Sequence, residues 1–146
     1  MPSAEALQAF YDVCTDVAGG DPEAYDRAGG AGWQAGDYEE GGPFKSIYSA
    51  YRAFDGYDEV SLWSSVETYK TQRLGYCRVD FGDPTSTIDF DDFASVAGLT
   101  GNVTEQDGYV FGVWETPDGQ KMVIADRREG VVQIEFNLRI PLTPAQ

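Results

Sequence analysis

The first regular pattern in the chain is a run of apolar residues at helical spacing. From Ser3 onward, apolar side chains recur every three or four positions, which predicts an amphipathic helix. Its apolar stripe consists of Leu7, Phe10, Tyr11, Cys14, Val17 and Ala18. Gly19-Gly20 ends this helix, and Asp21-Pro22-Glu23 is typical of the start of a second, shorter one. The two helices are expected within residues 3–30.

After residue 58 the pattern changes to the period of two that is typical of strands. Residues 59–69 and 73–81 are rich in β-forming side chains, and residues 109–115 and 121–126 flank a Pro-Asp-Gly turn. The clearest alternation lies at 131–140, where apolar and polar positions take turns. One apolar face and one polar face predict an antiparallel sheet with one side on the core.

Three further segments complete the expected layout. Residues 29–43 hold six glycines and are predicted to form a glycine-rich loop. Residues 44–54 fit a helix or a strand, and we favour a strand because a sheet follows. Asp89 is suited to cap a short helix over 89–97.

These elements predict an α+β fold. In this fold the N-terminal helices pack on one face of an antiparallel sheet of about five strands. One short helix is inserted before the last three strands. A chain of 146 residues suits a single domain, 1–146, with a sheet region at 45–140 and a tail at 141–146.

Charge narrows the classes of partner. The chain has 25 acidic and ten basic residues and no histidine, for a net charge of −15. A field of this sign repels nucleic acid and attracts basic proteins. Without histidine, mechanisms that pair serine or cysteine with histidine are excluded. No segment of the sequence resembles a transmembrane span, and we expect no membrane insertion and no nucleic-acid partner.

The two cysteines, Cys14 and Cys77, are 63 positions apart, and both fall on predicted apolar faces. They could meet in the core as a disulfide, or remain two buried thiols. We favour the disulfide, which points to an oxidising compartment. The chain shows no signal peptide, which suits either a mature exported domain or a cytoplasmic protein.

The order of motifs resembles a loose group of small exported α+β domains of unknown function from alphaproteobacteria. The shared outline is Phe10-x-x-x-Cys14, Ala24, Ala28, Gly32-Trp33, Cys77-Arg78-Val79 and Trp114…Asp118-Gly119. The resemblance implies export, to the periplasm or the exterior, and a bridge between Cys14 and Cys77. It implies no catalytic residue and no cofactor.

Aromatic residues suggest a surface for a partner, because tyrosine and tryptophan combine a large apolar area with a polar group. A near-neutral block at 45–79 is rich in them, and acidic blocks flank it. The expected partner surface consists of Trp33, Tyr38, Tyr51, Tyr57, Trp63 and Tyr69.

Acidic clusters offer an alternative. Carboxylates at 37–40 or 80–92, among them Asp37, Glu39, Asp91 and Asp92, could serve a hydrolase. The spacing at 80–92 does not match a calcium loop, and Asp89 is better explained as a helix cap, so we expect no metal site.

The function expected from the sequence is therefore non-enzymatic. We expect an exported domain that binds a protein or envelope partner, with a basic protein as the partner, through an acidic, aromatic-rich surface. The alternatives are a carboxylate-based hydrolase and a carrier that holds a small ligand between the first helix and the sheet.

Overall fold

Eight strands form one antiparallel sheet in the computed structural model, which describes residues 3–40, 45–54, 57–81, 88–96 and 98–142. The helices are α1 (Ser3–Val17), α2 (Ala24–Gly30) and the 3₁₀ helix η1 (Phe90–Ser95). The strands are β1 (Gln34–Glu40), β2 (Lys45–Phe54), β3 (Tyr57–Thr68), β4 (Gln72–Phe81), β5 (Thr100–Gln106), β6 (Tyr109–Glu115), β7 (Lys121–Arg128) and β8 (Val131–Pro141).

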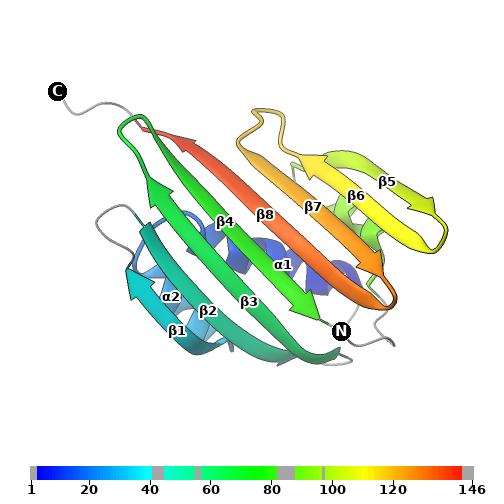
Figure 1. The fold of residues 1–146 in the computed structure, drawn as a ribbon, viewed down its shortest axis with the longest axis horizontal. Helices are drawn as coiled ribbons and strands as arrows, with labels where there is room; N and C mark the ends of the chain where they lie inside the picture. Colours follow the sequence, from blue (N-terminus) through cyan, green and yellow to red (C-terminus); the bar gives the residue numbers. More distant parts are fainter. Residues whose placement is uncertain (1–2, 41–44, 55–56, 82–87, 97, 143–146) are drawn as a thin grey trace.

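The sheet consists of two four-stranded meanders laid side by side. Its strand order is β1-β2-β3-β4-β8-β7-β6-β5, so β4 and β8 join the two meanders in the middle (Figure 1). These two strands are antiparallel, with Tyr76 opposite Asn137 and Arg78 opposite Glu135. The β6–β7 hairpin closes at the predicted turn, where the Asp118 side chain accepts a hydrogen bond from the Gln120 amide at 3.0 Å.

The predicted fold class is wrong. We expected helices packed on one face of a sheet of about five strands, whereas the described chain is mostly sheet, with eight strands and three short helices. The missed strands, β1 and β5, are the two edges of the sheet. All of β1 and all but one residue of β5 are exposed, so neither needs alternating apolar positions. β1 also occupies 34–40, inside the expected glycine-rich loop.

Other sequence-based interpretations are confirmed. Residues 45–54 form a strand, so the helix alternative for this segment is wrong. The first helix covers Ser3–Val17 and buries Leu7, Phe10, Cys14 and Val17 of the expected stripe, whereas Tyr11 is half-buried. Asp89 caps η1, and its carboxylate accepts a hydrogen bond from the Asp91 amide at 3.0 Å.

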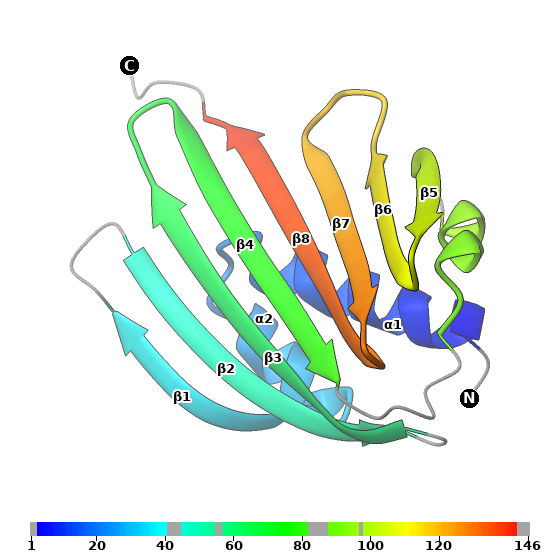
Figure 2. The ribbon, with the colours of Figure 1, turned by 45° about the vertical axis from the view of Figure 1, so that its right-hand side comes forward.

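All three helices lie on the same side of the sheet (Figures 1 and 2). α1 contacts β4 and β8, α2 lies beside β1, and η1 lies beside β5. Leu7, Phe10 and Val17 of α1 are fully buried. On the sheet they face buried side chains such as Val79 and Phe136. Each such side chain stabilises the fold by about 1.5–3 kcal/mol through burial.

Cys14 of α1 and Cys77 of β4 lie at disulfide distance, with 5.4 Å between their Cα atoms. Both side chains are fully buried. Beside them on β4, Gly75 leaves room for the end of α1, because a Cβ at this position would overlap the carbonyl of Ala18. The pair and the glycine together hold α1 against the middle of the sheet.

Candidate interaction surface

The side of the sheet that faces away from the helices is the candidate site, and we call it the outer face. Side chains alternate along β4, so Cys77 and Val79 point toward α1 while Tyr76 and Arg78 point away from it. In Figure 1 this face is turned to the viewer, and α1 lies behind the strands. None of the described helices covers it.

Apolar side chains gather on the outer face. Among the described residues, six large hydrophobic side chains are exposed, and four of them lie here: Trp63, Leu74, Met122 and Val131. Half-buried apolar neighbours extend the patch, namely Ile47, Tyr51, Tyr76, Phe111, Val113 and Ile124. A concentration of uncovered apolar side chains on one face is typical of a contact site.

The register arranges the outer face in rows across the strands. In the central row, Trp63, Arg78, Glu135 and Ile124 follow one another across β3, β4, β8 and β7. The next row toward the β8 start is Ser61, Asp80, Gln133 and Asp126. The row on the other side is Ser65, Tyr76, Asn137 and Met122.

Polar contacts hold the middle of these rows in place. The Arg78 Nε donates to Asp80 at 2.9 Å, and the Gln133 amide donates to the other carboxylate oxygen of Asp80 at 2.8 Å. The Trp63 and Tyr76 rings meet edge to face with 5.7 Å between centroids. The centre of the outer face is therefore preorganised, which lowers the entropic cost of binding.

Among the tyrosines of this face, Tyr76 has the most strongly raised pKa. Burial raises the pKa of its phenol to about 12, and the nearby Glu135 carboxylate adds to this shift. The phenol therefore remains a neutral hydrogen-bond donor at physiological pH. Beside it, an open depression of about 480 Å³ is lined by residues of β3, β4, β7 and β8, among them Glu67, Leu74 and Met122.

The outer face is close to electrically neutral. Among the described side chains of β2, β3, β4, β6, β7 and β8, five acids and four bases point outward: Glu67, Asp80, Glu115, Asp126 and Glu135, with Lys45, Arg78, Arg128 and Arg139. Glu39 of the edge strand β1 adds a sixth acid. The chain as a whole has 25 acids and ten bases. The described side chains of the outer face therefore account for only a small part of the net charge of −15.

The aromatic residues singled out in the sequence do not form one patch. Trp33 is 3% exposed and belongs to the core, and Tyr38 lies on the helix side of β1, where its ring meets Tyr25. Tyr69 lies at the β3–β4 turn and donates to Glu67 at 2.5 Å. Tyr51 and Trp63 do lie on the outer face.

Tyr57, the remaining residue of that set, begins β3, but its side chain lies outside the described part of the chain.

The sequence reasoning missed the side chains that β6 and β7 contribute to the outer face. Tyr109, Phe111 and Val113 point outward from β6, and Met122 and Ile124 from β7. Their inward neighbours are also largely apolar, for example Trp114 and Val123. Apolar residues on both faces of a strand are the signal that could have found this surface.

The candidate catalytic carboxylates are not brought together. Asp37 and Glu39 are exposed on the edge strand β1, whereas Asp91 and Asp92 belong to η1, beside the opposite edge strand β5. Asp83 lies outside the described residues. Within the described ranges, no three His, Cys, Asp or Glu side chains are grouped in a way that could hold a metal ion.

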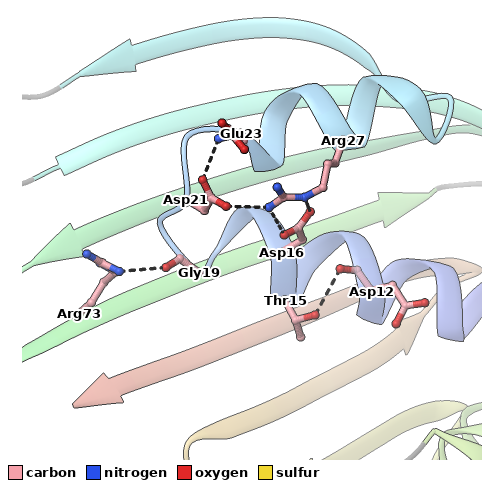
Figure 3. A network of polar contacts seen from close by, with 8 residues as sticks. All are labelled: Asp12, Thr15, Asp16, Gly19, Asp21, Glu23, Arg27 and Arg73. Atoms are coloured by element: carbon pink, nitrogen blue, oxygen red, sulfur yellow. Dashed lines mark hydrogen bonds and ion pairs between the residues drawn. The ribbon is translucent and has the colours of Figure 1, made fainter. Parts of the chain in front are cut away.

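A second polar cluster joins the two N-terminal helices (Figure 3). The guanidinium of Arg27 on α2 binds the Asp16 carboxylate of α1 through two hydrogen bonds, at 2.7 and 2.9 Å, and Asp21 at 3.1 Å. A hydrogen bond from the Glu23 amide lowers the pKa of Asp21, and Arg27 lowers it further. The charged groups of this cluster are used in fastening α1 to α2.

On the other side of the same junction, Arg73 of β4 donates to the Gly19 carbonyl at 3.2 Å.

Of the helices in the described ranges, none is both long and apolar enough to cross a bilayer. Comparison of the chain with protein-family models, with curated proteins and with solved structures finds no match.

Proposed function

We propose that this protein is a binding module and that the outer face of its sheet is the surface that receives a protein partner. The observation that carries the proposal is the concentration of exposed apolar side chains there, since Trp63, Leu74, Met122 and Val131 all lie on this face. Natural sheets that are solvated on one side carry mostly polar residues on that side. An apolar outer face is explained if a partner covers it.

The chemistry of the outer face suits a protein rather than a small molecule. Protein interfaces combine aromatic anchors and methionine in the centre with charged groups at the rim. Trp63, Tyr76 and Met122 are of the first kind, and Lys45 and Arg128 lie further out. A carrier that holds its ligand between α1 and the sheet is disfavoured, because buried side chains such as Phe10 and Phe136 occupy that space.

The outer face selects the charge of the partner. The net charge of −15 predicts a basic partner, whereas acids and bases are nearly balanced among the described side chains of the outer face. The mixed charges on the outer face favour a partner surface that also mixes both signs.

We propose further that the protein acts in an oxidising compartment, the periplasm or the cell exterior. Support comes from Cys14 and Cys77, which lie at disulfide distance. This proposal and the binding proposal are independent of each other.

A photo-crosslinking residue placed at position 63 tests the binding proposal, with the same residue at position 38 as the control. Trp63 and Tyr38 are both exposed aromatic residues, but only Trp63 lies on the outer face. We expect an adduct in the native cells from position 63 and none from position 38.

The protein in that adduct is then purified and titrated against the wild type and two variants. Saturable binding that weakens at least about tenfold in Met122→Lys and is unchanged in Tyr38→Lys supports the proposal. Equal adducts at both positions, or binding unaffected by Met122→Lys, would overturn it.

A further inference from the structure

We infer that the partner received by the outer face is a second copy of this chain, packed sheet against sheet around a two-fold axis that runs along the strands between β4 and β8. This inference rests on the proposed function and specifies its partner. Three properties of the outer face carry it: its size, its charge balance and the order of residues in its rows.

The size of the outer face matches a standard interface. Its six central strands present about 25 outward positions, and a stable protein interface uses about 20–30 residues on each side. Two sheets pack face to face with their strands within about 30° of each other and side chains interdigitating between them. The outer face is thus large enough for such a packing.

The near-neutral charge of the outer face explains how two chains, each with a net charge of −15, can associate. Most of the acids lie away from the outer face, so face-to-face packing directs them outward on both copies. The helices with Asp12, Asp16 and Asp26 then lie on the two far sides of the dimer, where solvent and salt screen them.

The order of residues makes the outer face complementary to itself. A two-fold axis along the strands places each position of β4 over the position of β8 in the same row of the other copy. Arg78 then faces Glu135, and Asp80 faces Gln133. Because the axis repeats every contact, each of these pairs occurs twice.

The apolar positions follow the same relation. The axis exchanges β3 with β7 and β2 with β6, so Trp63 faces Ile124, and Tyr51 lies over the row that contains Phe111. Trp63 and Tyr51 thus meet apolar groups on either side of a central line of polar pairs, whereas Met122 lies over Ser65 and Leu74 over Arg139. Arg78 bonds to Asp80 of its own chain through Nε, and an arginine has further N–H donors for a second carboxylate.

A charge-exchange experiment tests this arrangement with purified protein. In sedimentation velocity from micromolar to millimolar concentration, we expect the wild type to form a particle of twice the 16.0 kDa chain mass. Arg78→Glu alone, or Glu135→Arg alone, places like charges opposite each other twice and weakens the dimer at least about tenfold. An equimolar mixture of the two variants restores both pairs and dimerises as the wild type does.

Ile124→Lys is a second variant that weakens the dimer, and Tyr38→Lys is its matched control on the helix side of the sheet. Circular dichroism establishes that each variant is folded. A wild type that is monomeric at millimolar concentration, or a mixture that does not recover the dimer, would overturn the inference. Either result leaves the proposed function intact if the crosslinking residue at position 63 captures a different protein that Met122→Lys releases.

Discussion

Gly75 of β4 lies directly beneath the carbonyl group of Ala18, at the end of α1. A Cβ atom at position 75 would overlap that carbonyl and also approach the Ala18 Cβ at 2.9 Å. Two residues further along β4, Cys77 lies at disulfide distance from Cys14 of α1. The closeness of helix and sheet at this point therefore depends on the absence of a side chain.

Gly75→Ala is expected to destabilise the protein by about 1–3 kcal/mol, because the backbone at Ala18 has to shift in a packed region. Urea unfolding followed by circular dichroism measures the change. The matched control is Gly29→Ala in α2, where nothing lies within 4 Å of the added methyl group. The control should change stability by less than about 1 kcal/mol, in the stabilising direction. Equal effects in both variants would show that Gly75 has no packing role.

Linking Cys14 to Cys77 should contribute about 4 kcal/mol to stability, since the bridge closes a loop of 63 residues. Without reductant, the unfolded chain is expected to take up no alkylating reagent, as intact mass would show. Because both cysteines are buried, reductant should act only when the chain opens. The melting temperature should then fall clearly after reduction in denaturant and refolding. Two alkylated thiols in the unreduced protein would contradict the disulfide and remove the main support for an oxidising compartment.

Trp33 and Trp63 are expected to respond differently to substitution. Trp33 is 3% exposed within the core, and Trp33→Ala should cost about 3–5 kcal/mol. Trp63 is 36% exposed on the outer face, where Trp63→Ala removes its ring contact with Tyr76 and part of a full burial, and should cost clearly less than Trp33→Ala in the monomer. Urea unfolding of dilute protein gives both values. Similar losses would contradict the assignment of Trp33 to the core and Trp63 to the surface.

Tyr76 is expected to ionise at a higher pH than an ordinary tyrosine. Its pKa is raised to about 12 in the folded protein by burial and by Glu135, whereas an unfolded tyrosine ionises near pH 10. Between these two values the unfolded state releases a proton that the folded state keeps, so stability declines as the pH rises through this window and is unaffected below it.

NMR of ring-labelled tyrosine follows this titration, and Tyr76→Phe identifies the resonance. Glu135→Gln is expected to lower its midpoint, because the neutral amide no longer disfavours the phenolate. A midpoint near 10 in the wild type would show that Tyr76 is open to solvent.

Much of the chain could be placed from its sequence, because local patterns reflect local burial. Leu7, Phe10, Cys14 and Val17 identified α1 by their spacing, and the alternation at 131–140 identified β8. The acidic segment Asp37-Tyr38-Glu39-Glu40 did not predict β1, because all of its residues are exposed. An edge strand that is solvated on both faces leaves no alternation to read.

The sequence by itself determined the helices, the inner strands and the apolar faces on which the two cysteines lie, since each follows from spacing within about ten residues. Only the tertiary structure decided that β4 pairs with β8, and this pairing brings Arg78 beside Glu135 and Tyr76 beside Asn137. Contacts between residues more than 50 positions apart depend on which strands become neighbours, and short-range patterns do not encode that choice. The outer face exists only as a result of this pairing. Its row of aromatic, charged and apolar side chains is therefore a property of the folded sheet.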